Sequence, residues 1–205
     1  ATCNVTVTAE SDFVIENGVL KAYKGTAETV TIPETVKVIG DGESYIFGMG
    51  SSVKKVIIPD SVTAIADYAF GYATKLETVE FSKSGNLKTI GSGAFNIASA
   101  ITSLEIPEGV TEIGTRAFVG THALTTIYLP STLEKFGDST QPLYIMFANS
   151  SGSGHQSLAA VNVADGCTLF KSVDGVLYST DGKKLLFCPQ ARKQAVTVAD
   201  GTETI

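Results

Sequence analysis

The residues that most often carry chemistry in proteins are few in this sequence and lie far apart. It contains three cysteines and two histidines. No Cys-x-x-Cys pair occurs and neither histidine lies close to a cysteine along the chain, so the usual spacing of zinc ligands is absent. We predict thiols buried at apolar positions, of which at most one pair can form a disulfide, and surface histidines. These residues are Cys3, Cys167, Cys188, His122 and His155.

The sequence motifs of common enzymes are also missing. There is no G-x-S-x-G, no P-loop, no H-E-x-x-H and no G-x-G-x-x-G after a strand. The stretch Ser153-Gly154-His155 is rich in serine and glycine and is predicted to be a solvated loop. Several Asp-Gly pairs lack the alternating oxygen ligands of a calcium loop and are better explained as turns. We therefore predict a protein that is not an enzyme and that holds no metal or cofactor.

Composition narrows the choice of partner. The chain has 205 residues, 43% of them hydrophobic, which is enough for one folded domain or a modest repeat array. Its net charge of −6 argues against nucleic acid and against an anionic membrane surface, because both attract lysine and arginine. No apolar run approaches the roughly 18 residues of a membrane span, so we predict no membrane insertion.

The sequence contains an internal repeat. The pattern apolar-x-apolar-Pro ends at four prolines, and Ser82, Ala164 and Ala199 stand in the proline position of three further copies. From the first proline to Ala164, successive positions are 26, 23, 25, 23 and 34 residues apart, which is typical of a solenoid. The four prolines are Pro33, Pro59, Pro107 and Pro130.

One unit can be followed from strand to back wall. Ile127 and Leu129 share a face while Tyr128 points the other way, which predicts a short strand with one buried side. Proline ends the strand because it has no N–H for a continuing ladder. In the preceding repeat, Val110 and Ile113 follow Pro107 and suit a tight extended or 3₁₀ turn into the core. Gly114 is predicted to allow a sharp bend at positive φ. Paired Ala-Phe residues close the unit, and we predict one buried stack of Phe70, Phe95 and Phe118.

The run from Ile106 to Phe118, Ile-Pro-x-x-Val-x-x-Ile-Gly-x-x-Ala-Phe, resembles the BspA-type leucine-rich repeat. Asn17-Gly18-Val19-Leu20 is similar to the opening of such domains. Residues 165–190, with Asp174-Gly175 and Asp181-Gly182, are similar to the hairpin unit often inserted in them. The resemblance implies an α/β leucine-rich-repeat solenoid, a right-handed superhelix dominated by short parallel strands with little helix. It covers residues 13–205, after a tail or strand at 1–12.

The resemblance also implies a function. Such proteins are secreted or attached to the bacterial cell surface and bind extracellular or host proteins without catalysis, so we expect an adhesin-like role. A carbohydrate-binding module or a structural spacer in a larger surface protein is the alternative. A mixed polar and apolar surface favours a protein ligand, whereas a flat platform of exposed aromatic rings would favour carbohydrate.

Stacked strands should align the outward residue of each repeat into a row, which repeat proteins often use as a concave binding surface. Its expected centre is Ile57, Glu80, Glu105 and Tyr128. The insertion at 138–157 is the alternative site, with Tyr144, Ile145 and Met146 as anchors and Phe147 in the back wall. The complete set of candidate partner-binding residues is Lys55, Ile57, Glu80, Glu105, Tyr128 and Asn162.

The last ten residues repeat the beginning of a unit. Val196-Thr197-Val198 matches the strand and would extend the outward row to Thr197, and Ile205 matches the position of Ile113. The unit stops before its Ala-Phe pair, and no polar cap is visible after Ala199. We therefore expect the chain to be part of a longer array or to pack its C-terminal edge against another molecule.

Overall fold

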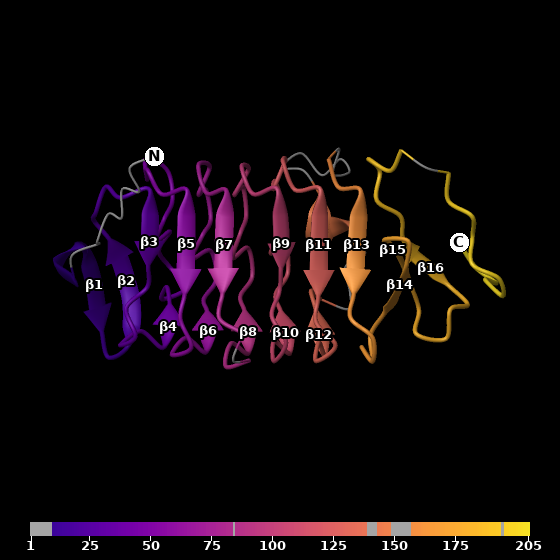
Figure 1. Cartoon of the computed structure of the whole chain (residues 1–205), viewed down its shortest axis with the longest axis horizontal. Coiled ribbons are helices and arrows are strands. Elements are labelled where there is room, and N and C mark those ends of the chain that lie inside the picture. The colour runs from indigo at the N-terminus through magenta and orange to yellow at the C-terminus, as the bar shows by residue number, and fades with distance from the viewer. Residues whose placement is uncertain (1–9, 84, 139–142, 149–156, 194) are drawn as a thin grey trace, which may run out of the picture.

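The structure, a computed structural model, describes residues 10–83, 85–138, 143–148, 157–193 and 195–205. These residues form a stack of coils that follow one another along the long axis of the molecule (Figure 1). Each coil crosses a front sheet, turns through a second sheet and returns along a back wall. The predicted β-dominated solenoid with short parallel strands is confirmed, and the described residues contain only two short 3₁₀ helices, η1 (Glu10–Asp12) and η2 (Leu143–Phe147).

The front strands are the predicted strands before the prolines. They form two parallel three-stranded sheets, one in the order β3-β5-β7 and the other in the order β13-β11-β9. Their inward residues are buried and their outward residues are more exposed, as a period of two requires. The strands are β3 (Thr29–Thr31), β5 (Lys55–Ile58), β7 (Thr78–Phe81), β9 (Ser103–Glu105), β11 (Thr126–Leu129) and β13 (Ala160–Val163).

The turn after each proline leads into a second sheet. The sequence predicted either an extended segment or a 3₁₀ turn after the proline. The structure shows two-residue parallel strands at this position. Ile113, for example, lies opposite Ile90 on one side and Phe136 on the other. The seven strands, in spatial order, are β1 (Phe13–Glu16), β2 (Val19–Tyr23), β4 (Val38–Ile39), β6 (Ala64–Ile65), β8 (Thr89–Ile90), β10 (Glu112–Ile113) and β12 (Lys135–Phe136).

An antiparallel hairpin covers the N-terminal end of the second sheet. β1 pairs with β2, and β2 pairs in parallel with β4 of the first coil. The hairpin turn is Asn17-Gly18, whose φ angles of 51° and 78° are those of a type I′ turn. Leu20 on β2 is fully buried, so the hairpin supplies the apolar cover that the first coil lacks on this side.

The back wall is a continuous column of phenylalanine rings. The predicted stack of Phe70, Phe95 and Phe118 is confirmed, with ring centroids 5.1 and 6.1 Å apart and planes within 11° of parallel. It continues to Phe47 at 5.3 Å and to Phe147 at 6.0 Å. Ile46 and Met146 stand where the other coils have the alanine of the Ala-Phe pair. All five rings are nevertheless buried, so these two replacements leave the column intact.

Glycine at the Ile-Gly position serves two purposes: Gly40 and Gly137 have positive φ angles of 88° and 70°, whereas at Gly114 the glycine allows close packing between coils. The prediction of a positive φ at Gly114 is wrong, because Gly114 is not among the residues with positive φ. A Cβ atom on Gly114 would lie 2.4 Å from the Ser92 nitrogen of the preceding coil. The backbones of the two coils therefore approach so closely that no side chain fits between them.

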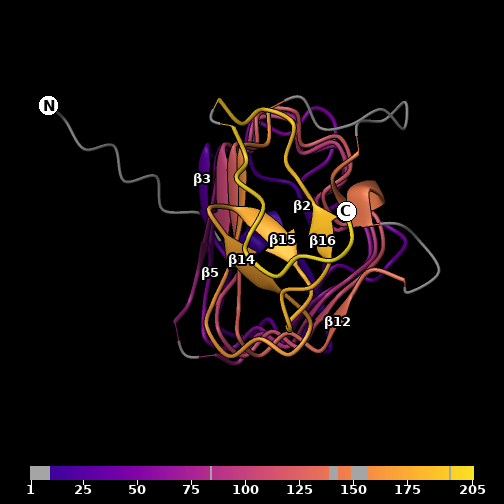
Figure 2. The same ribbon diagram turned by 90° about the vertical axis from the view of Figure 1, so that its right-hand side faces the viewer.

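A three-stranded antiparallel sheet crosses the C-terminal end of the stack (Figure 2). Its strands are β14 (Lys171–Val173), β15 (Val176–Tyr178) and β16 (Leu185–Phe187), all of which lie within residues 165–190. Phe187 stacks on Phe147 at 5.2 Å, and the Val161 N–H donates to the Gly175 carbonyl at 3.0 Å. This end sheet therefore covers the last coil, a cover that the sequence pattern did not reveal.

The predicted strand at Val196–Val198 is absent. These residues lie outside any strand, and none of the described residues from 195 to 205 is buried. Thr204 instead forms an isolated parallel bridge with Lys184, and Ile205 is 85% exposed. The local sequence matches a repeat, but β14 to β16 occupy the place where another coil would continue the front sheet, so Thr197 does not extend the row.

The aromatic column can be tested at its centre. We expect Phe95→Ala to lower the free energy of unfolding by about 3–5 kcal/mol, because it opens a cavity between two buried rings. Urea denaturation followed by circular dichroism measures the change. An unchanged midpoint would show that Phe95 does not stabilise the stack.

The close approach of the coils gives a second test. We expect Gly114→Ala to lower the free energy of unfolding by about 1–3 kcal/mol, because the new methyl group meets backbone atoms that cannot rotate away. Thermal unfolding would measure it. A variant as stable as the wild type would contradict the steric role of this glycine.

Candidate binding surface

The outward residues of the front strands lie in register within each of the two front sheets. Ile57 of β5 is opposite Thr31 on one side and Glu80 on the other. Across the second front sheet, Tyr128 is opposite both Glu105 and Asn162. We call these residues the front row: Thr31, Ile57, Glu80, Glu105, Tyr128 and Asn162.

The central side chains of the front row are exposed and do not belong to the core. Tyr128 is 49% exposed, and Glu80 and Glu105 are exposed as well. Ile57, Asn162 and the neighbouring Lys55 are partly exposed. The residues between them point inward and are buried, so the strand alternation separates a structural face from an available one. All six candidate partner-binding residues therefore reach the same face.

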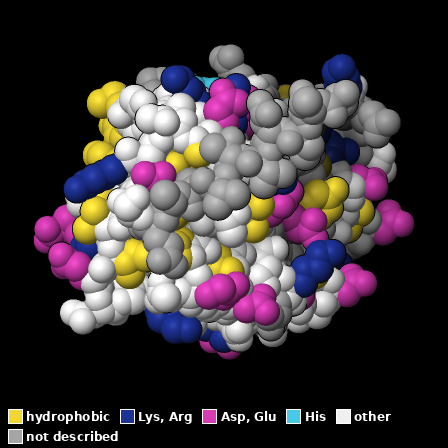
Figure 3. Space-filling model, turned by 60° about the vertical axis from the view of Figure 1, so that its left-hand side comes forward, with side chains coloured by type: hydrophobic (Ala, Val, Ile, Leu, Met, Phe, Trp, Pro, Cys, Tyr) yellow, Lys and Arg dark blue, Asp and Glu magenta, His cyan; other side chains and the backbone are white. Residues whose placement is uncertain are grey.

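Charges on this face are mostly engaged in exposed pairs. Lys55 Nζ lies 2.5 Å from Glu80 Oε1, and Lys54 Nζ lies 2.8 Å from Glu28 Oε1. The hydrogen bond with Glu28 raises the pKa of Lys54 above its usual value. Figure 3 shows charges of both signs interspersed with small groups of hydrophobic side chains on the side it presents.

Of the four residues singled out in the insertion, only Tyr144 is exposed. Within helix η2, Tyr144 is 50% exposed, but Met146 and Phe147 are buried and Ile145 is partly buried. Phe147 fills the back wall as expected. Residues 139–142 and 149–156, which include Ser153 and His155, lie outside the described residues.

A cluster of three tyrosines was missed in the sequence. Tyr45 packs edge-on against Tyr68 and Tyr72, with ring centroids 6.1 and 5.1 Å apart. Tyr68 and Tyr72 both have φ near +57°, an uncommon angle for residues other than glycine. Tyr45 and Tyr68 flank Ala-Phe-like pairs at the same position of successive coils, and this spacing is the signal that could have revealed the cluster. The rings meet edge to face and form no flat platform.

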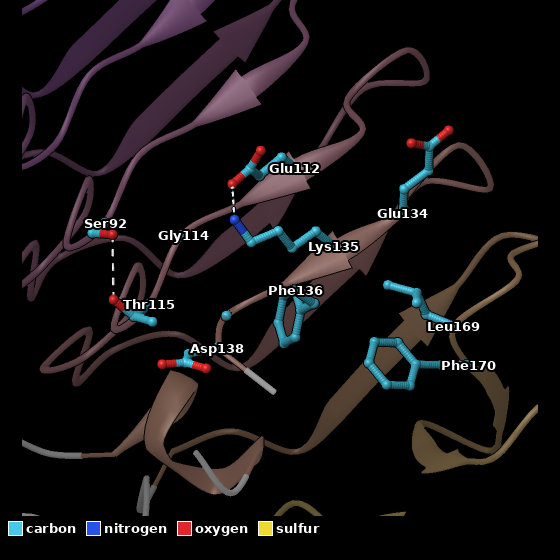
Figure 4. Close-up of a pocket in the computed structure, with 11 residues that line it drawn as sticks. Ser92, Glu112, Gly114, Thr115, Glu134, Lys135, Phe136, Asp138, Leu169 and Phe170 are labelled. Atoms are coloured by element: carbon cyan, nitrogen blue, oxygen red, sulfur yellow. Dashed lines mark hydrogen bonds and ion pairs between the residues drawn. The ribbon is translucent and has the colours of Figure 1, made fainter. Parts of the chain in front are cut away.

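A pocket of about 550 Å³ lies beside β10 and β12 (Figure 4). Phe136 and Phe170 meet in a T-shaped contact at 5.8 Å and form its apolar side. At the rim of the pocket, Lys135 forms an ion pair with Glu112. The hydrogen bond within this pair raises the pKa of Lys135. Sequence spacing could not reveal the pocket, because Phe170 follows the longest and least regular repeat.

A second hollow opens on the front face between β7 and β9. It measures about 430 Å³ and contains residues on both sides of the break between the two front sheets. Two front-row residues, Glu80 and Glu105, lie on opposite sides of it. We call this break the seam.

The expected candidates for metal and thiol chemistry are dispersed. Among the described residues, no group of three or more His, Cys, Asp or Glu side chains is placed to hold a metal ion. His122 is exposed. Cys167 is buried, as predicted, but Cys188 is exposed because it follows the end of β16, which corrects that prediction. Cys3 lies outside the described residues.

Among the described residues, no helix has the length and hydrophobicity required to span a membrane.

The repeat geometry agrees with a known sequence family. The model of the BspA type leucine-rich repeat region matches residues 15–150 in six copies. The chain belongs to the BspA-type leucine-rich repeat family. Residues beyond 150, including β13 and the end sheet, lie outside the match. No curated protein matches the chain.

Solved structures with this fold come from several bacteria. The leucine-rich repeat protein of Treponema pallidum, TpLRR, has a TM-score of 0.62 and 21% identity over 77% of this chain and 71% of its own. A leucine-rich repeat protein from Eubacterium ventriosum has a TM-score of 0.66 and 20% identity over 91% of this chain and 48% of its own. The pneumococcal vaccine antigen PcpA gives 0.61 and 19% over 96% and 60%. The chain thus spans about half of the Eubacterium ventriosum protein and three fifths of PcpA, and these likenesses show the fold alone.

The independence of the front row from the core can be measured. We expect Glu80→Gln and Glu105→Gln each to change the free energy of unfolding by less than about 0.5 kcal/mol, because exposed ion pairs and exposed carboxylates contribute little. Urea denaturation next to Phe95→Ala would check this. A loss comparable with that of Phe95→Ala would assign the front row to the fold.

Proposed function

We propose that the front row is a non-catalytic protein-binding surface, and that the protein acts in adhesion outside a bacterial cell or on its surface. The observation that carries the proposal is that Glu80, Glu105 and Tyr128 are all outward residues of the front strands and are all exposed, with Tyr128 opposite Glu105. Repeat proteins commonly bind along such extended faces. The partner would be an extracellular or host protein.

The chemistry of the row suits a protein partner. Tyr128 offers a large rigid ring with a hydroxyl, a combination enriched at the centres of protein interfaces. Ile57 adds apolar surface, and the flanking carboxylates give the polar and charged contacts that confer specificity. No step of this function requires a reacting group, a metal or a cofactor.

Family membership supports the proposed location. The match to BspA-type repeats and the likeness to PcpA, a vaccine antigen, are what would be expected of a protein outside the cell. Fractionation of the native cells with an antibody against the chain would test the location directly.

Carbohydrate binding is the second candidate because of the pocket in Figure 4. Its rings, Phe136 and Phe170, could contact an apolar sugar face, and Ser92 and Thr115, whose hydroxyl oxygens lie 3.2 Å apart, could contact sugar hydroxyls. A spacer role would leave both surfaces without a ligand.

A binding screen separates these functions. The immobilised chain would be tested against purified extracellular matrix and plasma proteins and against a glycan array. Saturable binding of a protein supports the proposal, binding of glycans alone supports the alternative, and binding of neither over the full panels would favour a spacer.

A matched pair of tyrosine variants then locates the surface. For any protein bound in the screen, we expect Tyr128→Ala to weaken binding by at least about tenfold, because it removes the central aromatic contact. Tyr144→Ala, which removes an equally exposed ring from the insertion, should change little. Biolayer interferometry measures both, and the reverse result would move the site to the insertion.

A further inference from the structure

The seam interrupts one side of an otherwise continuous stack. The coils that contain β7 and β9 remain joined by the second sheet, where the Gly114 N–H donates to the Ile90 carbonyl at 2.8 Å. They also remain joined along the back wall, where the Phe95 N–H donates to the Ala117 carbonyl at 2.9 Å. On the front face, however, no backbone hydrogen bond joins β7 to β9, and Figure 1 shows the wider separation.

Two extra residues account for the seam. The inward residue of a front strand is followed nine positions later by the inward residue of the second sheet, as from Val56 to Ile65 and from Leu104 to Ile113. In the coil of β7 the interval from Val79 to Ile90 is eleven. The longer turn reaches the next coil at Gly109, where an added Cβ would lie 2.2 Å from the Gly85 oxygen. The turn thus acts as a wedge beside the ends of the two strands.

The seam leaves strand edges without partners. A parallel strand bonds its two neighbours through alternate residues. Thr78 and Ser82 donate their N–H groups to the carbonyls of Lys54 and Ile58, so Val79 and Phe81 direct their N–H and carbonyl groups toward the seam. On the other side, Ile106 donates to the Tyr128 carbonyl, so Ser103 and Glu105 face the seam. Such edges inside a sheet are open to another hydrogen-bonding group.

The walls of the seam select the charge of that group. Val79, Phe81 and Pro107 provide apolar surface. The charged residues that line the seam are three glutamates and one lysine, which together give a net charge of −2: Glu80, Glu105, Glu108 and Lys83. Glu80 is paired with Lys55, and Glu108 accepts from the Ser131 N–H and hydroxyl. Among the residues that the structure describes, none forms an ion pair or hydrogen bond with the Glu105 carboxylate.

We infer that the seam binds an arginine side chain presented by a partner protein. This deepens the proposed function and rests on it, because it assigns a specific anchor to the front row. A guanidinium group carries five N–H donors in a planar fork, which can bond a carboxylate and neighbouring carbonyl oxygens together, while its methylene groups cover Val79 and Phe81. A lysine offers a single charged point and fits these acceptors less well.

An inserted strand fits the seam less well than a side chain. A strand between β7 and β9 would need roughly 4.8 Å on each side, close to 10 Å in all. Cα atoms of β7 and β9 approach within 8 Å, so the seam is too narrow for a full strand along its length. A single long side chain entering from the front face needs no such separation.

A peptide series tests the inference. The probe is a fluorescent heptapeptide, Gly-Thr-Val-Arg-Val-Thr-Gly, with versions in which lysine or citrulline replaces arginine. We expect the arginine peptide to bind with Kd below about 1 mM, and the citrulline peptide, which keeps the shape without the charge, to bind at least about tenfold more weakly. Binding should weaken as NaCl rises from about 50 to about 500 mM. Equal binding of the three peptides, or no binding of the arginine peptide, overturns the inference.

Substitutions place the peptide on the chain. Glu105→Gln should weaken binding of the arginine peptide at least about tenfold, because it removes the carboxylate available to the guanidinium group. Glu34→Gln is the matched control, since Glu34 is exposed but follows the proline of the first coil. If both variants bind like the wild type, the peptide lies elsewhere and the inference fails.

A deletion tests the seam itself. Removing residues 83 and 84 restores the nine-residue interval of the other coils, so β7 and β9 should pair. Hydrogen exchange should then show slow amides at Ser103 and Glu105, where the wild type shows fast ones, and the arginine peptide should lose at least about tenfold in affinity. Slow exchange in the free wild type would contradict the open seam, and Glu105→Gln keeps the test valid if the deletion does not fold.

The outcome is distinguishable from failure of the proposed function. If Tyr128→Ala weakens binding of a protein partner while the arginine peptide does not bind, the front row stands and the seam inference falls. If the peptide binds but no protein in the screen does, the seam is a ligand site and the proposed partner class is wrong.

Discussion

No coil of this protein can bury its own apolar side, and the rest of the structure depends on that constraint. Each coil contributes inward strand residues, a short second strand and one phenylalanine ring, and each becomes buried only when the next coil stacks on it. The five rings of the back wall show the repeat at its strictest, with centroids 5.1–6.1 Å apart. The same constraint accounts for the antiparallel strands, β1 with β2 and β14 to β16, that cover the first and last of the described coils.

Stacking also separates the parts of the chain that maintain the fold from those that are free to bind. Because side chains alternate along a strand, every inward residue of the front sheet has an outward neighbour that the core does not need. Selection on a ligand can therefore act on Glu80, Glu105 or Tyr128 with little cost to the stack. The interval between the front strand and the second strand of a coil is constrained more closely, and the front sheet is interrupted at the coil that has two added residues after β7.

Periodic features could be predicted from the sequence and local exceptions could not. The prolines and Ala-Phe pairs gave the front strands, the aromatic column and the outward row, because each recurs at a nearly fixed interval. The second sheet was left undecided because two-residue strands carry no alternation to recognise. The strand expected at Val196–Val198 is absent, since a local pattern cannot show that the end sheet already occupies the next position. The tyrosine cluster and the two hollows depend on contacts between coils, which spacing within a coil does not record. Cys188 is exposed because β16 ends just before it, a boundary that the apolar run did not show.

The seam also has a mechanical consequence. Hydrogen bonds between coils run along the long axis of the molecule, so the coil interfaces resist bending and stretching as elements connected in series. The compliance of such a rod is greatest at its weakest element. Here that element is the interface between the coils of β7 and β9, which is bonded through the second sheet and the back wall but not on the front. A load on the rod would therefore concentrate its deformation at this one joint and leave the coils on either side nearly rigid.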